Sequence, residues 1–185
     1  MRKKIRNYEN SNHIQSSSNN GGFSLVEILV TILILVLLVA VITFRISTTK
    51  YADVERCSKN IEQKMSQLRL SVMSSKTQEY FIIYQAADNN YYMTIADDKD
   101  AVCTASDGEQ IGNSKIHIKG TTSIGEINVN FTDNKRIIIT FHRSTGAFIS
   151  VGGDLYQTIE IATEGIMFRI YLVKETGKHY SKQIN

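Results

Sequence analysis

The sequence of 185 residues predicts an α+β fold in which one long N-terminal helix packs on an antiparallel β-sheet domain. Three observations support this prediction. An apolar run extends from Phe23 to Ile42, and an apolar stripe with helical spacing follows it. From Tyr80 onward, short β-rich segments alternate with turn residues. These patterns divide the chain into residues 1–22, an apolar helix over 23–44, an amphipathic helix over 45–75 and a β-rich globular domain over 76–185.

The first 22 residues are basic. They hold four Lys and Arg side chains against Glu9, a net charge of +3, and the other 17 basic and 17 acidic residues of the chain cancel. A basic segment ahead of an apolar run favours a cytoplasmic N-terminus by the positive-inside rule. Residues 23–185 have no overall positive charge that would attract nucleic acid.

The apolar run from Phe23 to Ile42 has the length of a membrane-spanning helix. Its twenty residues would make a helix of about 30 Å, the thickness of the hydrocarbon core of a bilayer. Glu27 is the only charged residue in the run. A lone acid in a membrane costs roughly 2.5–3.5 kcal/mol on insertion scales, so we expect Glu27 to have a specific partner.

A secretory signal peptide would give a different pattern. Such peptides have an apolar core of roughly 7–15 residues, followed by a cleavage site of the small-x-small type. The run here is longer, and Thr43-Phe44-Arg45 after Ile42 fits that site poorly. We therefore expect residues 23–42 to stay with the mature protein as a single-pass membrane segment. An ordinary signal-anchor helix with an acid near its end is the alternative.

The segment Gly22-Phe23-Ser24-Leu25-Val26-Glu27-Ile28-Leu29-Val30 resembles the N-terminal signature of type IV prepilins and type II secretion pseudopilins. The resemblance implies that prepilin peptidase cleaves between Gly22 and Phe23, that the new amine of Phe23 is methylated, and that Glu27 helps each subunit to dock. The implied partners are prepilin peptidase, other pilin or pseudopilin subunits and an inner-membrane assembly platform. The globular domain would be extracytoplasmic, in a pilus or pseudopilus after assembly.

The chemistry of these residues agrees with that resemblance. A carboxylate in an apolar environment is tolerated when a cation pairs with it, and cleavage would free the amine of Phe23 as such a cation. The first and fifth residues of a helix lie about one turn apart. The amine of one subunit could therefore pair with its own Glu27 or with that of a neighbour.

An amphipathic helix follows the apolar run. Its apolar positions recur at spacings of three or four residues, and they are Val54, Cys57, Ile61, Met65, Leu68 and Val72. No proline occurs in the chain, and no glycine lies between Gly22 and Gly108, so one helix over about 23–75 is permitted. The stripe lacks clean heptads, which favours packing on the chain's own sheet over a coiled coil.

The remaining residues predict a domain of antiparallel strands. Alternating or continuous apolar runs bounded by Gly, Asn, Asp and Ser indicate strands at 80–85, 91–96, 115–119, 126–131, 136–142, 147–150, 158–163 and 166–173. About 105 residues of this kind can bury one modest core against the helix stripe.

The C-terminal part resembles H-type pseudopilins and related minor pilins. The segments that carry the resemblance are a strand that runs into a turn, Phe141-His142-Arg143-Ser144-Thr145-Gly146, and the closing turn Thr176-Gly177-Lys178. Strands at 158–163 and 166–173 lie between them. This second resemblance implies a minor, tip-associated subunit of the filament.

The two cysteines leave two readings open. Cys57 on the helix stripe and Cys103 before a turn could be small buried residues, or they could form a disulfide in an exported domain. Too few ligands at suitable spacing occur for a zinc site, and Asp97-Asp98-Lys99-Asp100 lacks the glycine and distal glutamate of an EF-hand. We found no catalytic motif, and we expect neither an enzyme nor a cofactor.

The C-terminal residues offer an alternative function. Lys174, Lys178 and Lys182 lie near Tyr171 and Tyr180 in the sequence. Basic side chains can contact phosphates, and an adjacent aromatic ring can stack on a base. The alternative is therefore a competence-type minor pilin that binds extracellular DNA. An ordinary solvated tail explains the same residues.

Overall fold

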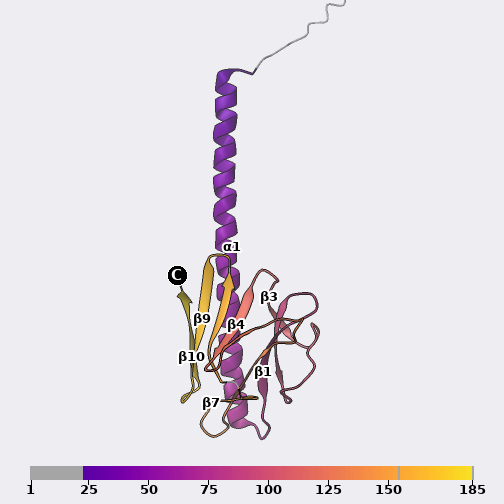
Figure 1. Ribbon diagram of the computed structural model, residues 1–185. Coiled ribbons are helices and arrows are strands. Elements are labelled where there is room, and N and C mark those ends of the chain that lie inside the picture. Colours follow the sequence, from indigo (N-terminus) through magenta and orange to yellow (C-terminus); the bar gives the residue numbers. More distant parts are fainter. Residues whose placement is uncertain (1–22, 154, 185) are drawn as a thin grey trace, which may run out of the picture. The chain divides into compact units, whose positions relative to one another are not determined.

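The computed structural model describes residues 23–153 and 155–184, and for residues 42–48 it describes the backbone only. Figure 1 shows one long helix and a set of strands that follow it in the sequence. The chain divides into two units between Ile42 and Thr43, which are described separately below. Residues 1–22, the segment that the predicted cleavage would remove, lie outside the described residues.

Helix α1 extends from Leu25 to Ser74, so the prediction of one helix over about 23–75 is confirmed to within two residues. In the second unit, the predicted apolar stripe of α1 is completely buried: Val54, Cys57, Ile61, Met65, Leu68 and Val72 each have an exposed fraction of 0%. The stripe packs on the chain's own sheets, as its spacing predicted.

Ten strands follow the helix in the described part of the chain, and they form two five-stranded antiparallel sheets. The strands are β1 (Tyr80–Gln85), β2 (Tyr91–Ala96), β3 (Glu109–Gly112), β4 (His117–Thr122), β5 (Glu126–Asn128), β6 (Ile137–Phe141), β7 (Phe148–Ile149), β8 (Tyr156–Thr163), β9 (Ile166–Val173) and β10 (Lys178–Ile184). The first sheet has the order β3-β2-β1-β6-β7 and the second has the order β10-β9-β8-β4-β5. The α+β class is therefore confirmed.

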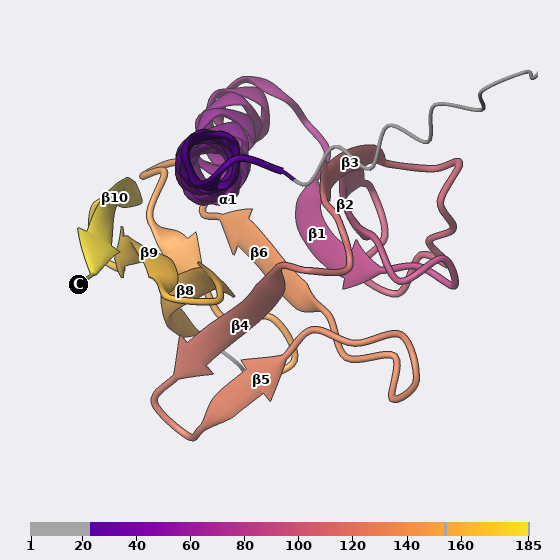
Figure 2. The ribbon, with the colours of Figure 1, turned by 90° about the horizontal axis from the view of Figure 1, so that it is seen from above.

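The main core lies between α1 and the inner faces of both sheets. Figure 2 shows the helix end-on with the strands of both sheets beside it. Alternate residues of β1 face opposite ways: Phe81 and Ile83 join the main core, while Ile82 and Tyr84 belong to a second apolar cluster. Cys103, in the loop between β2 and β3, packs on that second cluster. The first sheet is thus covered on both faces.

The eight strands predicted from the sequence are all present, and three of them have the predicted bounds. Two strands were not predicted. β3 is four residues long, and β10 has polar residues at most positions, so neither gave the apolar alternation on which the prediction depended. The residues expected to be a solvated tail are therefore the edge strand of the second sheet.

Arg69 of α1 joins the two glycine turns of the C-terminal half. Its Nε donates to the carbonyl oxygen of Gly146 at 2.9 Å, and its guanidinium also donates to the carbonyl oxygen of Thr176 at 2.8 Å. Both glycines have positive φ, 66° at Gly146 and 65° at Gly177. The turns touch, because a Cβ at Gly177 would lie 1.8 Å from the Gly146 oxygen. The two turns of the second resemblance therefore meet on α1.

Candidate functional site

The first turn of α1 holds the described residues of the predicted processing and assembly site. The backbone N–H of Glu27 donates to Ser24 Oγ at 3.2 Å, and the N–H of Ile28 donates to the Ser24 carbonyl oxygen at 3.2 Å. Ser24 is therefore the N-cap of the helix. Phe23 precedes the cap and has an exposed fraction of 76%.

Ser24 was not assigned a role in the sequence analysis. The signal that could have found it is Ser24-Leu25-Val26-Glu27, the S-x-x-E pattern of a capping box. The cap starts the helix directly after the predicted cleavage point. A new amine at Phe23 would then lie at the positive end of the helix dipole, where a carboxylate in the first turn is favourable.

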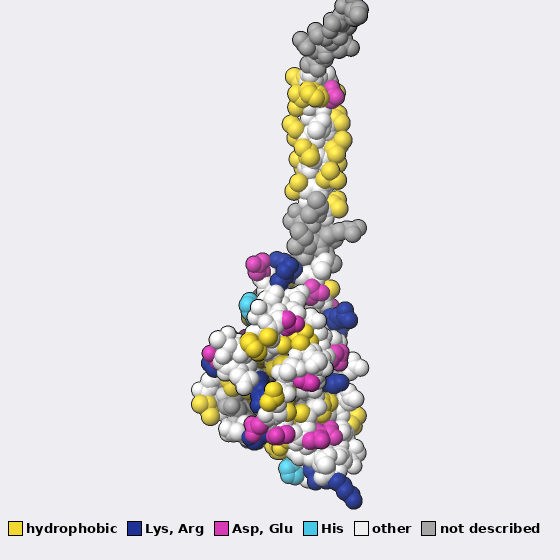
Figure 3. Space-filling model, turned by 90° about the vertical axis from the view of Figure 1, so that its right-hand side faces the viewer, with side chains coloured by type: hydrophobic (Ala, Val, Ile, Leu, Met, Phe, Trp, Pro, Cys, Tyr) yellow, Lys and Arg dark blue, Asp and Glu magenta, His cyan; other side chains and the backbone are white. Residues whose placement is uncertain are grey.

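Glu27 is exposed on an otherwise apolar part of the helix. The large hydrophobic side chains of residues 25–41 have exposed fractions between 45% and 79%, and Figure 3 shows them along the face of the helix that is in view. Thr31 Oγ1 donates to the backbone oxygen of Glu27 at 2.7 Å. No cation pairs with the Glu27 carboxylate among the residues that the structure describes. This carboxylate is free to accept a positive partner.

The predicted membrane span is not confirmed. Among the residues that the structure describes, no helical segment combines the length and the apolarity that a membrane crossing requires.

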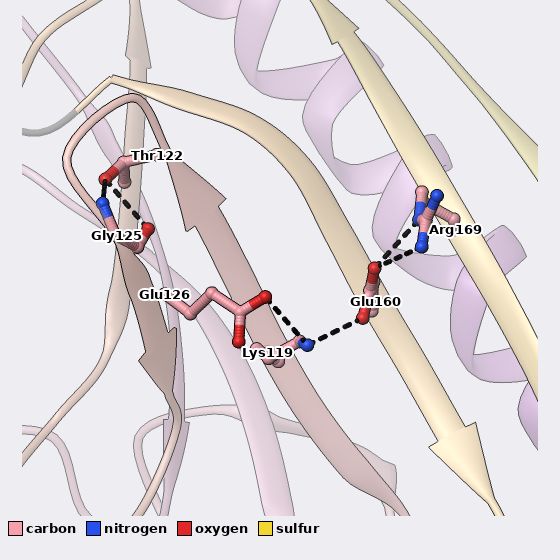
Figure 4. Close-up of polar contacts among 6 residues, drawn as sticks. All are labelled: Lys119, Thr122, Gly125, Glu126, Glu160 and Arg169. Atoms are coloured by element: carbon pink, nitrogen blue, oxygen red, sulfur yellow. Dashed lines mark hydrogen bonds and ion pairs between the residues drawn. The ribbon is translucent and has the colours of Figure 1, made fainter.

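The outer face of the second sheet carries a ladder of charged side chains. Glu160 of β8 has a side chain that is 10% exposed, and it lies between Lys119 Nζ at 3.0 Å and Arg169 Nη2 at 2.6 Å (Figure 4). Lys119 also contacts Glu126 at 3.1 Å. Burial alone would raise the pKa of Glu160, but the hydrogen bonds from Lys119 and Arg169 outweigh it, and the pKa is lowered.

The predicted DNA-contact lysines lie on the edge strand of this sheet and on the turn before it. Lys178 and Lys182 are exposed on β10, two residues on either side of Tyr180, and Lys174 is exposed in the turn that connects β9 to β10. The rings of Tyr171 and Tyr180 stack with centroids 5.3 Å apart. The structure thus brings Lys178 and Lys182 together with both tyrosines on neighbouring strands.

His179 faces the other way. Its Nε2 lies 2.9 Å from Ser66 Oγ and 3.0 Å from the Glu62 carbonyl oxygen, which attaches β10 to α1.

The disulfide between Cys57 and Cys103 is not formed, and both cysteines are free. Cys57 lies in the main core and Cys103 packs on the second cluster, so the first sheet separates them. Cys57 is buried and Cys103 is half-buried. Burial raises the pKa of the Cys57 thiol to about 12. Within the described residues, no group of three or more His, Cys, Asp or Glu side chains is placed to hold a metal ion.

No curated protein and no solved structure matches the chain. A family model does match its N-terminal part. Residues 17–43 match the prokaryotic N-terminal methylation motif, which includes the described residues Phe23, Ser24 and Glu27. This part of the chain therefore carries the N-terminal methylation signature found in type IV pilins and pseudopilins.

Proposed function

We propose that this protein is a minor pilin or pseudopilin, a structural subunit of a type IV pilus or of a type II secretion-like filament. Prepilin peptidase cleaves it between Gly22 and Phe23, and the new amine of Phe23 is methylated. Before assembly, the subunit is a single-pass protein of the cell membrane with its β domain on the extracytoplasmic side. An inner-membrane assembly platform then moves it into the filament.

The observation that carries this proposal is the unpaired carboxylate of Glu27 in the first turn of an exposed apolar helix. Capping by Ser24 places that turn directly after the predicted cleavage point. An ion pair between Glu27 and the amine of a neighbouring Phe23 would satisfy the carboxylate once water is excluded. Such a pair would also fix the axial position of one subunit against the next.

The first experiment is intact-mass and N-terminal peptide analysis of the protein from its native membrane, with and without prepilin peptidase. We expect a chain that begins at N-methylated Phe23 only when the peptidase is present. A chain that keeps residues 1–22, or one that is cut beyond Ile42, would contradict the proposal.

The assembly role of Glu27 has its own test. Glu27→Val should leave cleavage intact and reduce the share of the protein found in filaments, because no carboxylate remains to pair with the amine. Thr31→Val is the matched control, since it also replaces a polar side chain of the apolar helix, four residues away. Normal incorporation of the Glu27→Val protein would exclude a docking role for Glu27.

The DNA-binding alternative stays a prediction. Its test is salt-dependent retention of DNA by the full chain, compared with a variant in which Lys174, Lys178 and Lys182 are all replaced by Ala. Retention that survives these replacements would exclude these lysines as the contact. We also expect no catalytic activity, since neither the sequence nor the described site suggests a reaction.

A further inference from the structure

The charges of the β domain are separated although they nearly cancel overall. Residues 166–184, which form β9, β10 and their turn, hold four basic side chains and one acidic side chain. Residues 86–107, which form β2 with its flanking turn and loop, hold five acidic side chains and one basic side chain. Figure 2 shows β10 and the loop between β2 and β3 on opposite sides of the domain. Two segments of opposite net charge therefore lie on opposite sides of the domain.

The positive segment has an ordered surface. The strand register places Arg169 opposite Lys182 and Tyr171 opposite Tyr180. Lys178 is two residues from Tyr180, on the same face of β10. We call these five residues the basic face. The alternate residues Phe168, Ile170 and Leu172 point into the core, so the basic face points outward.

The basic face lacks enough negative charge of its own. Arg169 pairs with Glu160, a carboxylate that Lys119 shares. Neither Lys178 nor Lys182 has an ion-pair partner among the described residues. Like charges directly opposite each other on neighbouring strands are destabilising. A carboxylate that approaches from another molecule would relieve this repulsion.

The negative segment has such carboxylates on a well-held loop. Residues 97–107, which we call the acidic loop, hold four aspartates and one lysine. Asp100 pairs with Lys99 and Arg136, whereas Asp97 and Asp98 have no ion-pair partner among the described residues. Arg136 donates to the Ala101 carbonyl oxygen at 2.7 Å, and Tyr84 donates to the Thr104 carbonyl oxygen at 2.8 Å. Val102 in the middle of the loop has an exposed fraction of 89%. The loop thus offers carboxylates beside an exposed apolar side chain, which suits a surface of cations and tyrosine rings.

We propose that the basic face of one subunit binds the acidic loop of a second copy of this chain. The inference rests on the proposed function, because it assigns lateral contacts within the same filament. The two surfaces are different and lie on opposite sides of the domain, so the contact is heterologous. Repeated heterologous contacts build open helical assemblies, whereas a two-fold contact between basic faces would bring like charges together.

The test uses the full-length, processed protein in its native membrane and filaments. A carbodiimide joins a lysine amine to a carboxylate without a spacer, and the dimeric product is digested for peptide mapping. We expect links from Lys178 or Lys182 to Asp97 or Asp98. Replacing both lysines by Gln should remove the link, while Lys76→Gln, at an exposed lysine elsewhere, should leave it.

Charge reversal gives a second readout. Lys182→Glu or Asp98→Lys alone should reduce incorporation into filaments about two- to fivefold, the range expected for an exposed ion pair that becomes a repulsion. Both changes in one chain should restore incorporation, because the pair is rebuilt with its charges exchanged. A structural defect in either variant would not be repaired by the other.

The two proposals fail in distinguishable ways. A chain that is cleaved at Gly22 and enters filaments, but gives no such link and no rescue, would overturn the self-contact and leave the proposed function standing. A chain that is never cleaved would overturn the proposed function. DNA retention that depends on Lys178 and Lys182, in filaments without the link, would assign the basic face to nucleic acid and exclude the self-contact.

Discussion

The two parts of helix α1 have similar apolar side chains and opposite environments. Between residues 25 and 41, the large hydrophobic side chains are 45–79% exposed. From Val54 to Val72, the six stripe residues are not exposed at all. Each part belongs to a different unit of the chain.

The difference lies in how the apolar residues are arranged. In the second unit they form one stripe, and polar residues cover the other faces, so a single packing partner suffices. Residues 25–41 are apolar except for Glu27 and Thr31 and form no single stripe, so one sheet could not cover them. The stripe is covered by its own chain, whereas the apolar side chains of residues 25–41 are exposed in the single chain.

The largest effect should come from removing a buried side chain of the stripe. Leu68→Ala should lower the free energy of unfolding of the β domain by about 2–5 kcal/mol, because it removes buried methyl groups and leaves a cavity. Leu35→Ala is the matched change in the exposed part, where Leu35 is 56% exposed. It should leave the unfolding of the domain unchanged. Urea denaturation of the full chain in detergent measures both, and equal losses would contradict the comparison.

A smaller loss should follow when the glycine turns are forced away from Arg69. Gly177→Ala would place a Cβ 1.8 Å from the Gly146 carbonyl oxygen and also strain a positive φ. We expect a loss of about 2–4 kcal/mol, from overpacking together with backbone strain. Gly152→Ala separates the two causes, since Gly152 has a φ of 64° but no atom within 4 Å of the added Cβ. A Gly177→Ala loss no larger than that of Gly152→Ala would show that the turns are not tightly packed.

Much of this fold could be predicted because burial follows simple spacing. The six stripe residues of α1 were identified by intervals of three and four, and the core strands by their apolar runs. β10 was missed because its inward-facing residues are polar. His179 contacts Ser66 Oγ and the Glu62 backbone oxygen. This strand is therefore attached to α1 by hydrogen bonds and not by apolar burial alone.

The residues of the candidate site also fall into those that the sequence alone could identify and those that depend on the tertiary structure. Glu27 was singled out because an acid in an apolar run is costly, an argument that needs no tertiary structure, and its docking role stays a prediction. Four residues of the basic face were singled out in the sequence as a possible DNA contact, but Arg169 was not, because its place depends on the register that sets it against Lys182 of β10. Whether Cys57 and Cys103 can form a disulfide likewise depends on which face of the first sheet each residue packs against. Pairings across strands are set by turn geometry and packing, which one sequence specifies only indirectly.

The free energy of unfolding of the second unit should depend on pH through Glu160, which lies on the outer face of the second sheet and not on the stripe. Glu160→Gln keeps the size of the side chain but removes the charge that Lys119 and Arg169 contact. We expect a loss of about 1–3 kcal/mol near pH 7, typical of hydrogen bonds to a charged group. Glu126→Gln should cost less, because Glu126 is 55% exposed and contacts Lys119 alone.

The sign of the pH effect follows from the lowered pKa of Glu160 in the folded state. Its stabilising contribution is complete above the unfolded pKa of about 4.3, and it is lost as the pH falls through the lower folded value. The difference between the wild-type protein and Glu160→Gln should therefore shrink in urea titrations below about pH 4. A difference that stayed constant down to acid pH would show that the Glu160 charge does not contribute. The Leu68→Ala loss serves as the reference, because it removes no titratable group.

The smallest effect should come from the start of the apolar part. Ser24→Ala removes the oxygen that accepts the Glu27 N–H, and loss of an N-cap costs about 1 kcal/mol. Since the helix in this unit has no core of its own to hold its first turn, the loss should appear as fraying of residues 25–28 and not as unfolding of the β domain. Amide hydrogen exchange in detergent micelles should accelerate about fivefold at these residues. Ser24→Asn, which also caps helices, should retain the protection. If both variants exchange at the wild-type rate, the first turn is held by something other than its cap, and the position of Glu27 relative to Phe23 would have to be set by a neighbouring subunit.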